Sequence, residues 1–181
     1  MKRCGWENSE EMIIYHDNEW GKPVYDDKKL FEFLTLEGMQ AGLSWSTILS
    51  KRESFRKAFD DYDLDLIKNY NEDKLNSLYN NKDIIRNKLK IKSVVNNAKC
   101  FIEVQKEFGS FSKYIWQFVN NKQVINNFKK LSDVPVLTQE SINMSKDLKR
   151  RGFKFVGPTI CYAYMQAVGL VNDHLIDCDY K

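Results

Sequence analysis

The segment 87–108 carries apolar residues at helical spacing along its whole length, and this feature constrains the fold more than any other. Its apolar positions are Ile91, Val94, Val95, Ala98, Phe101, Ile102 and Phe108. Steps of three and four residues place such side chains on one face of an α-helix. Alternating patterns typical of strands are nearly absent elsewhere, and no repeat or low-complexity linker divides the chain. We therefore expect an all-α protein.

Capping and turn residues separate further helical segments on either side of this long helix. We expect helices at about 10–18, 28–40, 46–59, 71–79, 110–118, 138–151 and 159–168. Asn71, Ser110 and Thr138 favour helix N-termini, whereas Gly109 and Gly152 favour helix ends. The Asn-rich segment 119–137 predicts a loop or a weak helix. A chain of 181 residues is expected to form a single domain, 1–181.

The charge is mildly basic, with a net charge of +3, and the cations gather in two blocks, 82–99 and 146–154. Such blocks are compatible with nucleic acid and equally with solvated helix faces. The first residues contain no apolar signal segment, and glycines and a proline interrupt the longest uncharged apolar run, 155–171. We expect a soluble, cytoplasmic protein whose four cysteines are reduced.

Glu37 lies on the apolar stripe of the predicted helix 28–40, one turn after Phe33 and Leu34. No cation is placed to pair with it, and an unpaired buried carboxylate needs a hydrogen-bonding partner, a raised pKa or a ligand. Gly38 and Gly42 follow, and then the flat face of Trp45. This combination predicts a pocket for a planar polar molecule. The alternative is a helix-end carboxylate satisfied within the protein, with the tryptophan in the core.

The only two histidines, His16 and His174, each lie near a cysteine in the sequence, Cys4 and Cys178. His174 and Cys178 are four residues apart, so they face the same way on a helical turn. Thiolates and imidazoles are the ligands that tetrahedral zinc prefers, and a closed set of four is a structural site. Such a site would join the two ends of the chain. Two surface histidines and two incidental cysteines are the alternative.

Several blocks of the sequence resemble those of a known family. They are Met1–Trp6, Tyr15–Gly21, Leu36–Trp45, Ile84–Arg86, Arg151–Gly157 and Gly169–His174. In the same order along the chain, they are similar to the DNA-3-methyladenine glycosylase I family, the Tag branch of the helix-hairpin-helix DNA glycosylases. The resemblance implies a helix-hairpin-helix glycosylase-like helical domain with N- and C-termini tethered by zinc. It also implies a base-excision repair enzyme that hydrolyses the N-glycosidic bond of 3-methyladenine in alkylated DNA.

The resemblance assigns residues to the flipped base and to a metal. Glu37, the catalytic residue, and Tyr15 would hydrogen-bond the base edge, and Trp45 would stack on its face. Trp6 and Trp20 would complete the aromatic wall. The zinc ligands would be Cys4, His16, His174 and Cys178, holding one structural ion.

The resemblance also implies contacts with double-stranded alkylated DNA. Gly42 and Leu43 would lie against the gap in the duplex, and the hairpin region 71–95, with Arg86, Lys88 and Lys90, would hold phosphates. Free 3-methyladenine is the expected product. No Schiff-base lysine is evident, so we expect a monofunctional enzyme without lyase activity. We expect a monomer and no membrane partner.

Two departures and two alternatives accompany this interpretation. The hairpin segment 80–86 contains no glycine but does contain Asp83, and the superfamily's catalytic aspartate motif is not recognisable. One alternative is a catalytically weak, zinc-stapled DNA-binding sensor of alkylated bases. The other is a zinc hydrolase using His16, His174 and Asp173, which would require an open metal position.

Overall fold

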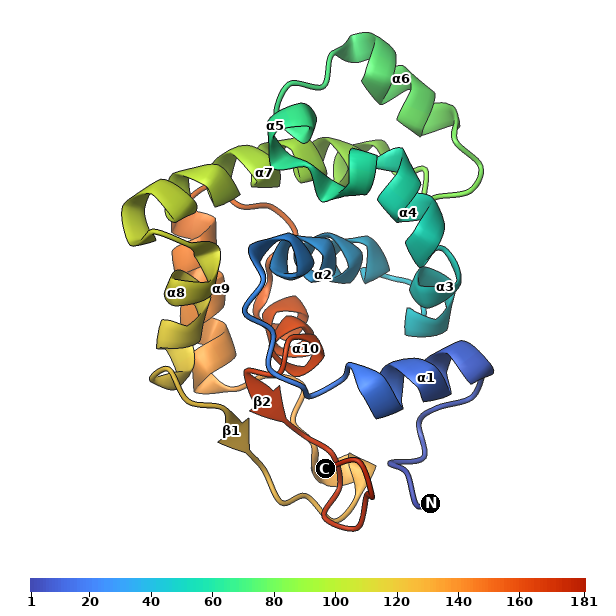
Figure 1. The fold of residues 1–181 in the computed structure, drawn as a ribbon, viewed down its shortest axis with the longest axis vertical. Helices are drawn as coiled ribbons and strands as arrows, with labels where there is room; N and C mark the ends of the chain where they lie inside the picture. The colour runs from blue at the N-terminus through green and yellow to red at the C-terminus, as the bar shows by residue number, and fades with distance from the viewer.

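Helix α2 (Asp27–Gln40) lies at the centre of the computed structural model, which describes residues 1–181 (Figure 1). Asp26 caps its N-terminus by accepting a hydrogen bond from the backbone N–H of Lys29. Its buried residues are Leu30, Phe31, Glu32, Phe33, Leu34, Thr35, Leu36, Glu37 and Met39. A helix buried on nearly every side carries its polar residues into the interior, so the predicted position of Glu37 in the core is confirmed.

The long helix α7 (Lys88–Phe108) crosses above α2 in Figure 1, and it confirms the strongest periodic pattern in the sequence. Asn87 caps it through a hydrogen bond from the backbone N–H of Lys90, and Gly109 ends it with a φ of 87°. Only glycine adopts that left-handed conformation at little cost. Helices α2, α7, α8 (Phe111–Trp116) and α10 (Pro158–Ala167) pack together around the main core.

The remaining predicted helices are also present, with their expected caps. They are α1 (Glu10–Asn18), α6 (Glu72–Asn80) and α9 (Gln139–Arg150), and a short helix α5 (Leu64–Ile67) was not expected. Asn71, Ser110 and Thr138 each accept a hydrogen bond from a backbone N–H in the first turn that follows. Three short 3-10 helices, η1 (Asp60–Tyr62), η2 (Gln117–Val119) and η3 (Leu131–Asp133), complete the helical elements.

The single helix predicted at 46–59 is wrong, because the chain forms two helices there. Helix α3 (Trp45–Ser50) ends at Lys51, whose φ and ψ of −103° and 0° lie outside the α-helical range, and α4 (Arg52–Ala58) begins after it. The Ser50 hydroxyl donates a hydrogen bond of 2.9 Å to the carbonyl of Thr47. A hydroxyl that bonds back to the preceding turn competes with the helical pattern and bends it.

The all-α expectation needs one small correction. Two-residue strands β1 (Val124–Ile125) and β2 (Val171–Asn172) pair in parallel and fix the Asn-rich loop against the end of the chain. Gly169 precedes β2 with a φ of 70°, and a Cβ there would lie 2.2 Å from the carbonyl carbon of Lys22. The close passage of these two segments therefore requires glycine.

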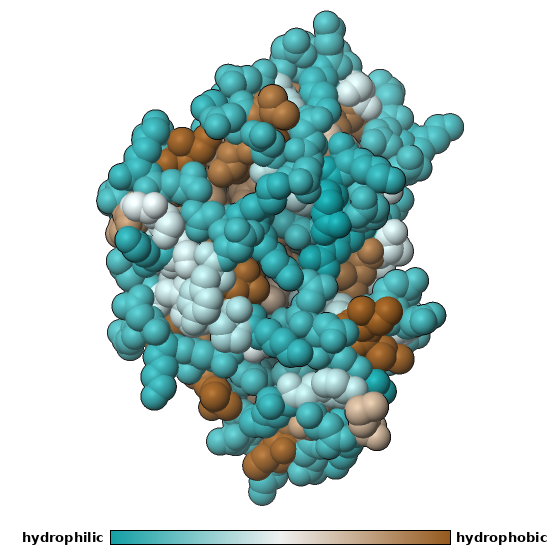
Figure 2. All heavy atoms as spheres, in the orientation of Figure 1, coloured by the Kyte–Doolittle hydropathy of each residue, from teal (hydrophilic) through white to brown (hydrophobic).

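The two chain ends lie beside each other (Figure 1). The backbone N–H of Lys2 donates to the Asp179 carboxylate at 2.7 Å, and that of Asp179 donates to the Lys2 carbonyl at 2.9 Å. The face shown in Figure 2 is mainly hydrophilic, with small separate apolar patches. No helix combines the length and the apolar character needed to cross a bilayer.

Candidate active site and metal centre

A cavity of about 380 Å³ opens beside the C-terminal end of α2 and contains every residue predicted to contact a base. Its lining residues are Trp6, Met12, Tyr15, Trp20, Glu37, Gln40, Trp45, Leu131, Val134, Pro135, Val136, Ala163 and Gln166. Residues from five separate parts of the sequence meet here. A volume of this size accommodates a small molecule such as a nucleobase.

Four aromatic rings, those of Trp6, Tyr15, Trp20 and Trp45, line one part of the cavity. The ring centroids of Tyr15 and Trp45 lie 5.4 Å apart, and those of Trp6 and Trp20 lie 5.1 Å apart. Tyr15 also contacts Trp6, with a centroid separation of 6.4 Å. Flat, polarizable surfaces of this kind favour a planar ligand, and more strongly one that carries positive charge.

Glu37 is the only carboxylate that lines the cavity, and it is 4% exposed. It has no ion pair or hydrogen bond with the protein. Burial raises the pKa of Glu37 from 4.5 to about 8, because the ionised form loses its hydration without gaining a partner. The carboxyl group is therefore largely neutral at neutral pH. Burial likewise raises the pKa of Tyr15, which remains a hydroxyl donor.

Three buried polar atoms of the cavity residues have no hydrogen-bond partner. They are Nε1 of Trp6, Nε1 of Trp45 and Oε2 of Glu37. Buried polar groups in folded proteins are almost always paired, so three unpaired groups around one cavity indicate partners supplied by a ligand. Two N–H donors and a carboxyl group match the ring nitrogens and amino group of a purine.

The sequence did not predict the wall formed by the loop 131–136, nor Gln40 and Gln166. Gln40 lies three residues after Glu37 on the same helix face, so helical spacing could have identified it. Gln166 donates a hydrogen bond of 2.9 Å to the Asp173 carboxylate. The loop has no periodicity, and nothing in its sequence indicates that it would cover a cavity.

Cys4, His16, His174 and Cys178 form a buried cluster whose possible ligand atoms lie within 4.8 Å of one another. The Sγ atoms of Cys4 and Cys178 lie 3.6 and 3.3 Å from Nδ1 of His174, and Cys178 Sγ lies 3.6 Å from Nε2 of His16. Zinc bonds of about 2.3 Å to sulfur and about 2.0 Å to nitrogen put tetrahedral ligands roughly 3.5 Å apart. This group could therefore bind a metal ion, as the sequence predicted.

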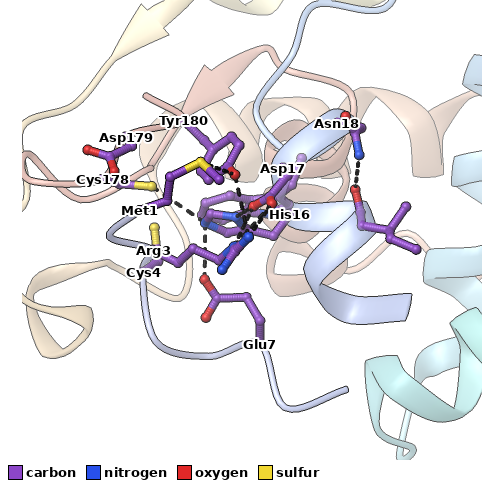
Figure 3. A network of polar contacts seen from close by, with 12 residues as sticks. Met1, Arg3, Cys4, Glu7, His16, Asp17, Asn18, Cys178, Asp179 and Tyr180 are labelled. Atoms are coloured by element: carbon purple, nitrogen blue, oxygen red, sulfur yellow. Dashed lines mark hydrogen bonds and ion pairs between the residues drawn. The ribbon is translucent and has the colours of Figure 1, made fainter. Parts of the chain in front are cut away.

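The second nitrogen of each histidine has a hydrogen-bond partner, and Figure 3 shows the one between His16 and Asp17. Nδ1 of His16 lies 2.7 Å from the Asp17 carboxylate, which Arg3 holds in turn with bonds of 2.9 and 2.8 Å. The Arg3 guanidinium holds the pKa of the Asp17 carboxyl well below its usual range. Nε2 of His174 donates to the carbonyl of Trp20 at 2.9 Å. These partners direct the remaining nitrogen of each ring towards the cluster.

The metal cluster and the cavity share a wall. Adjacent residues of α1 serve the two sites, because Tyr15 lines the cavity and His16 belongs to the cluster. Trp20 contributes its ring to the cavity and its carbonyl to His174. A metal that joins the termini would therefore also fix the aromatic wall in place.

Asp173 accepts hydrogen bonds from Asn126, Tyr162 and Gln166 at 2.6–2.9 Å and is 1% exposed. A carboxylate with three donors is not a free base, so the geometry gives no support to a hydrolase that uses Asp173.

The predicted DNA contacts separate into exposed and buried residues. Arg86 and Lys88 are exposed, Leu43 is 40% exposed, and Gly42 adopts a φ of 79°. Lys90 is 6% exposed, so the geometry gives no support to its predicted contact with phosphate.

The ammonium group of Lys90 turns inward instead. It donates to the carbonyls of Met39 at 2.9 Å and Ala41 at 2.5 Å. The last carbonyls of a helix lack partners within the helix, and a cation there is favourable. Lys90 therefore fixes the end of α2 and the start of the Gly42–Leu43 turn.

Two curated relatives and one solved structure are similar to the chain over nearly its whole length. The DNA-3-methyladenine glycosylase of Haemophilus influenzae is 47% identical over 180 residues, covering 99% of this chain and 97% of the relative. DNA-3-methyladenine glycosylase 1 of Escherichia coli is 45% identical, covering 98% and 96%. A structure of 3-methyladenine DNA glycosylase I from Staphylococcus aureus, concerned with 3-methyladenine recognition, is 36% identical with a TM-score of 0.96, covering 100% and 97%.

Together, the fold, the cavity and the comparisons show that the protein is an enzyme of the DNA-repair glycosylase class. A model of the family described as methyladenine glycosylase matches residues 6–181. The chain belongs to the methyladenine glycosylase family.

Proposed function

We propose that this enzyme removes 3-methyladenine from alkylated duplex DNA by flipping the damaged nucleotide into the aromatic cavity and hydrolysing its N-glycosidic bond. The observation that carries the proposal is the set of unpaired polar atoms on Trp6, Glu37 and Trp45 within that cavity. The names of the relatives support the same substrate. Flipping is least costly for a damaged base, because its pairing is already weakened.

The chemistry needs little acid catalysis. A purine methylated at N3 carries a positive charge while it is joined to the sugar, and this charge weakens the glycosidic bond. When the bond breaks, its electron pair goes to the base, which leaves neutral, and water adds to the sugar carbon and releases a proton. An indole N–H bonded to a ring nitrogen becomes more favourable as that electron density returns.

Glu37 has a specific part in this reaction. Burial raises its pKa to about 8, and a cationic base bound beside it would favour the ionised form. The ionised carboxylate then accepts hydrogen bonds from the amino edge of the base and stabilises the positive charge that develops on the sugar. Tyr15 provides a further hydrogen bond and, with Trp45, a stacking surface.

We further propose that α6, the turn 81–87 and the start of α7 act as a helix-hairpin-helix element on the DNA backbone. Arg86 and Lys88 are exposed at this turn, and Leu43 is exposed at the turn that follows α2. Leu43 would fill the space that the flipped nucleotide leaves.

No lysine lines the cavity, and Lys90 is bonded to backbone carbonyls, so no Schiff base forms and the enzyme is monofunctional.

We assign zinc to the cysteine–histidine cluster, as a structural ion. Two thiolates and two imidazoles at tetrahedral spacing fit this metal, and four protein ligands leave no position for water or substrate. The ion would supply a cross-link between the chain ends and take no part in bond cleavage.

The test is chromatography of free bases released from methylated duplex DNA. We expect 3-methyladenine to appear with the wild-type protein and to fall strongly with Glu37→Gln, without strand cleavage. Glu140, exposed in the first turn of α9, provides the control Glu140→Gln, which should release base at the wild-type rate. Binding of methylated DNA by folded, metal-loaded protein without release of any base would contradict the proposal and favour a sensor.

A further inference from the structure

A second hollow, of about 410 Å³, lies between helix α7 and the loop that joins α9 to α10. It is lined by Leu89, Lys92, Ser93, Asn96, Lys154 and Phe155. None of these residues lines the base cavity or belongs to the metal cluster. The function described above gives none of these side chains a role of its own, and the two lysines come from the two basic blocks of the sequence.

Side chains of α7 hold the loop side of this hollow rigidly. Asn96 donates to the carbonyl of Gly152 at 2.8 Å. Asn97 bonds both backbone groups of Lys154, accepting from its N–H at 2.8 Å and donating to its carbonyl at 3.0 Å. The next residue, Phe155, has a φ of 55°, a strained value for a side chain of that size. The loop therefore presents Lys154 in a fixed position.

The two lysines of the hollow carry unpaired charge. Lys92 and Lys154 are exposed, and neither forms an ion pair with a carboxylate. Arg150 and Arg151, from the same basic block as Lys154, are instead bonded to Asp147. These two arginines are therefore paired within the protein, whereas the cations at the hollow remain available to an anion.

The hollow adjoins the surface already proposed to meet DNA. A Cβ on Gly38, next to Glu37, would lie 3.5 Å from Phe155, so the hollow borders the last turns of α2. Leu89, 72% exposed, is flanked in sequence by the proposed phosphate contact Lys88 and by Lys90, which is bonded to the end of α2. The hollow thus continues the hairpin surface towards the loop 152–157.

We propose that this groove holds the sugar–phosphate backbone of duplex DNA beside the flipped nucleotide, with Lys92 and Lys154 each neutralising one phosphate and Leu89 packing against the sugars. The proposal rests on the DNA-glycosylase function above and extends its DNA-binding surface by one site. Two unpaired cations at the edge of a groove with an apolar side match a polyanion whose sugars are apolar.

The test is the salt dependence of affinity for a duplex that carries an abasic-site analogue, measured for Lys92→Met, Lys154→Met and the double variant. Each phosphate contact contributes about 0.9 to the slope of log K against log salt. We therefore expect the slope to fall by about one for each substitution and about two for the double variant. Affinity for free 3-methyladenine should not change.

Lys99→Met is the matched control, because Lys99 is exposed on the same helix, two turns beyond Lys92 and about 10 Å away. It should keep the wild-type slope. Unchanged slopes for the groove variants, or an equal loss with Lys99→Met, would overturn the inference even if base release is normal. Absence of base release by the wild-type protein would overturn the proposed function instead, and the slopes would still report on the groove.

Discussion

The metal cluster and the base cavity both use residues of helix α1. The polar atoms of the cluster have partners within the protein, whereas several polar atoms of the cavity have none. In the cluster, each histidine nitrogen either faces a cysteine or donates to an oxygen, as His16 does to Asp17 and His174 does to Trp20. In the cavity, polar atoms of Glu37 and Trp45 have no partner. With the zinc proposed above, the cluster would join the chain ends and stabilise the fold. We expect the unpaired atoms of the cavity to lower stability and a bound base to restore that free energy.

Removal of the metal should have the largest effect. The four possible ligands come from the N- and C-terminal segments, so the proposed zinc would contribute binding free energy on the order of 10 kcal/mol to folding. We expect a strong chelator to lower the melting temperature sharply and to abolish base release in parallel, as followed by circular dichroism and chromatography. Loss of activity with unchanged melting would show that the ion acts in chemistry and would remove the contrast between the two sites.

Glu37→Gln should raise stability, and the gain should grow with pH. The pKa of Glu37 in the folded protein is about 8, above the ordinary value of 4.5. The protonated carboxyl therefore stabilises the fold fully below pH 4.5, and this stabilisation is lost as the pH rises through 8. Across that interval the wild-type protein loses up to about 1.4 kcal/mol per pH unit relative to the variant. Denaturant unfolding of both proteins at pH 5 and pH 8 measures this difference. Equal differences at the two pH values would show that the carboxyl group is solvated or paired.

Lys90→Met should destabilise the protein by about 1–3 kcal/mol, because two carbonyls at the end of α2 lose a charged donor. We expect base release to fall as well, since the same carbonyls position Glu37 and the turn at Leu43. Lys88→Met is the control on the exposed side of the helix, and its stability should stay within about 0.5 kcal/mol of wild type. Similar stability of the two variants would show that Lys90 does not hold α2.

Trp45→Phe should have the smallest effect, and its two consequences should differ in sign. Phenylalanine keeps an aromatic face but removes the unpaired Nε1–H, so stability should be unchanged or slightly higher. Affinity for 3-methyladenine should fall by about 1 kcal/mol, the value of a single hydrogen bond. Calorimetric titration and thermal unfolding measure the two quantities. A fall in stability with unchanged affinity would assign the indole to the core.

Local patterns in the sequence were sufficient to predict most of the helices and the cysteine–histidine cluster. Periodicity and caps identified α2 and α7, and the only two histidines lie near Cys4 and Cys178. The inward turn of Lys90 could also have been predicted, because Lys90 precedes Val94 by one helical turn on the buried stripe. The break at Lys51 and the cavity wall from 131–136 could not, because tertiary packing decides them.

The most direct test is titration of free 3-methyladenine into the wild-type protein and Glu37→Gln, followed by tryptophan fluorescence. The rings of Trp6, Trp20 and Trp45 all line the cavity and report its occupancy. We predict saturable binding by the wild-type protein and at least tenfold weaker binding by Glu37→Gln. The control variant Glu140→Gln should bind 3-methyladenine with the wild-type affinity. Equal affinities of wild-type and Glu37→Gln proteins would contradict the claim that the unpaired polar atoms of the cavity recognise the base.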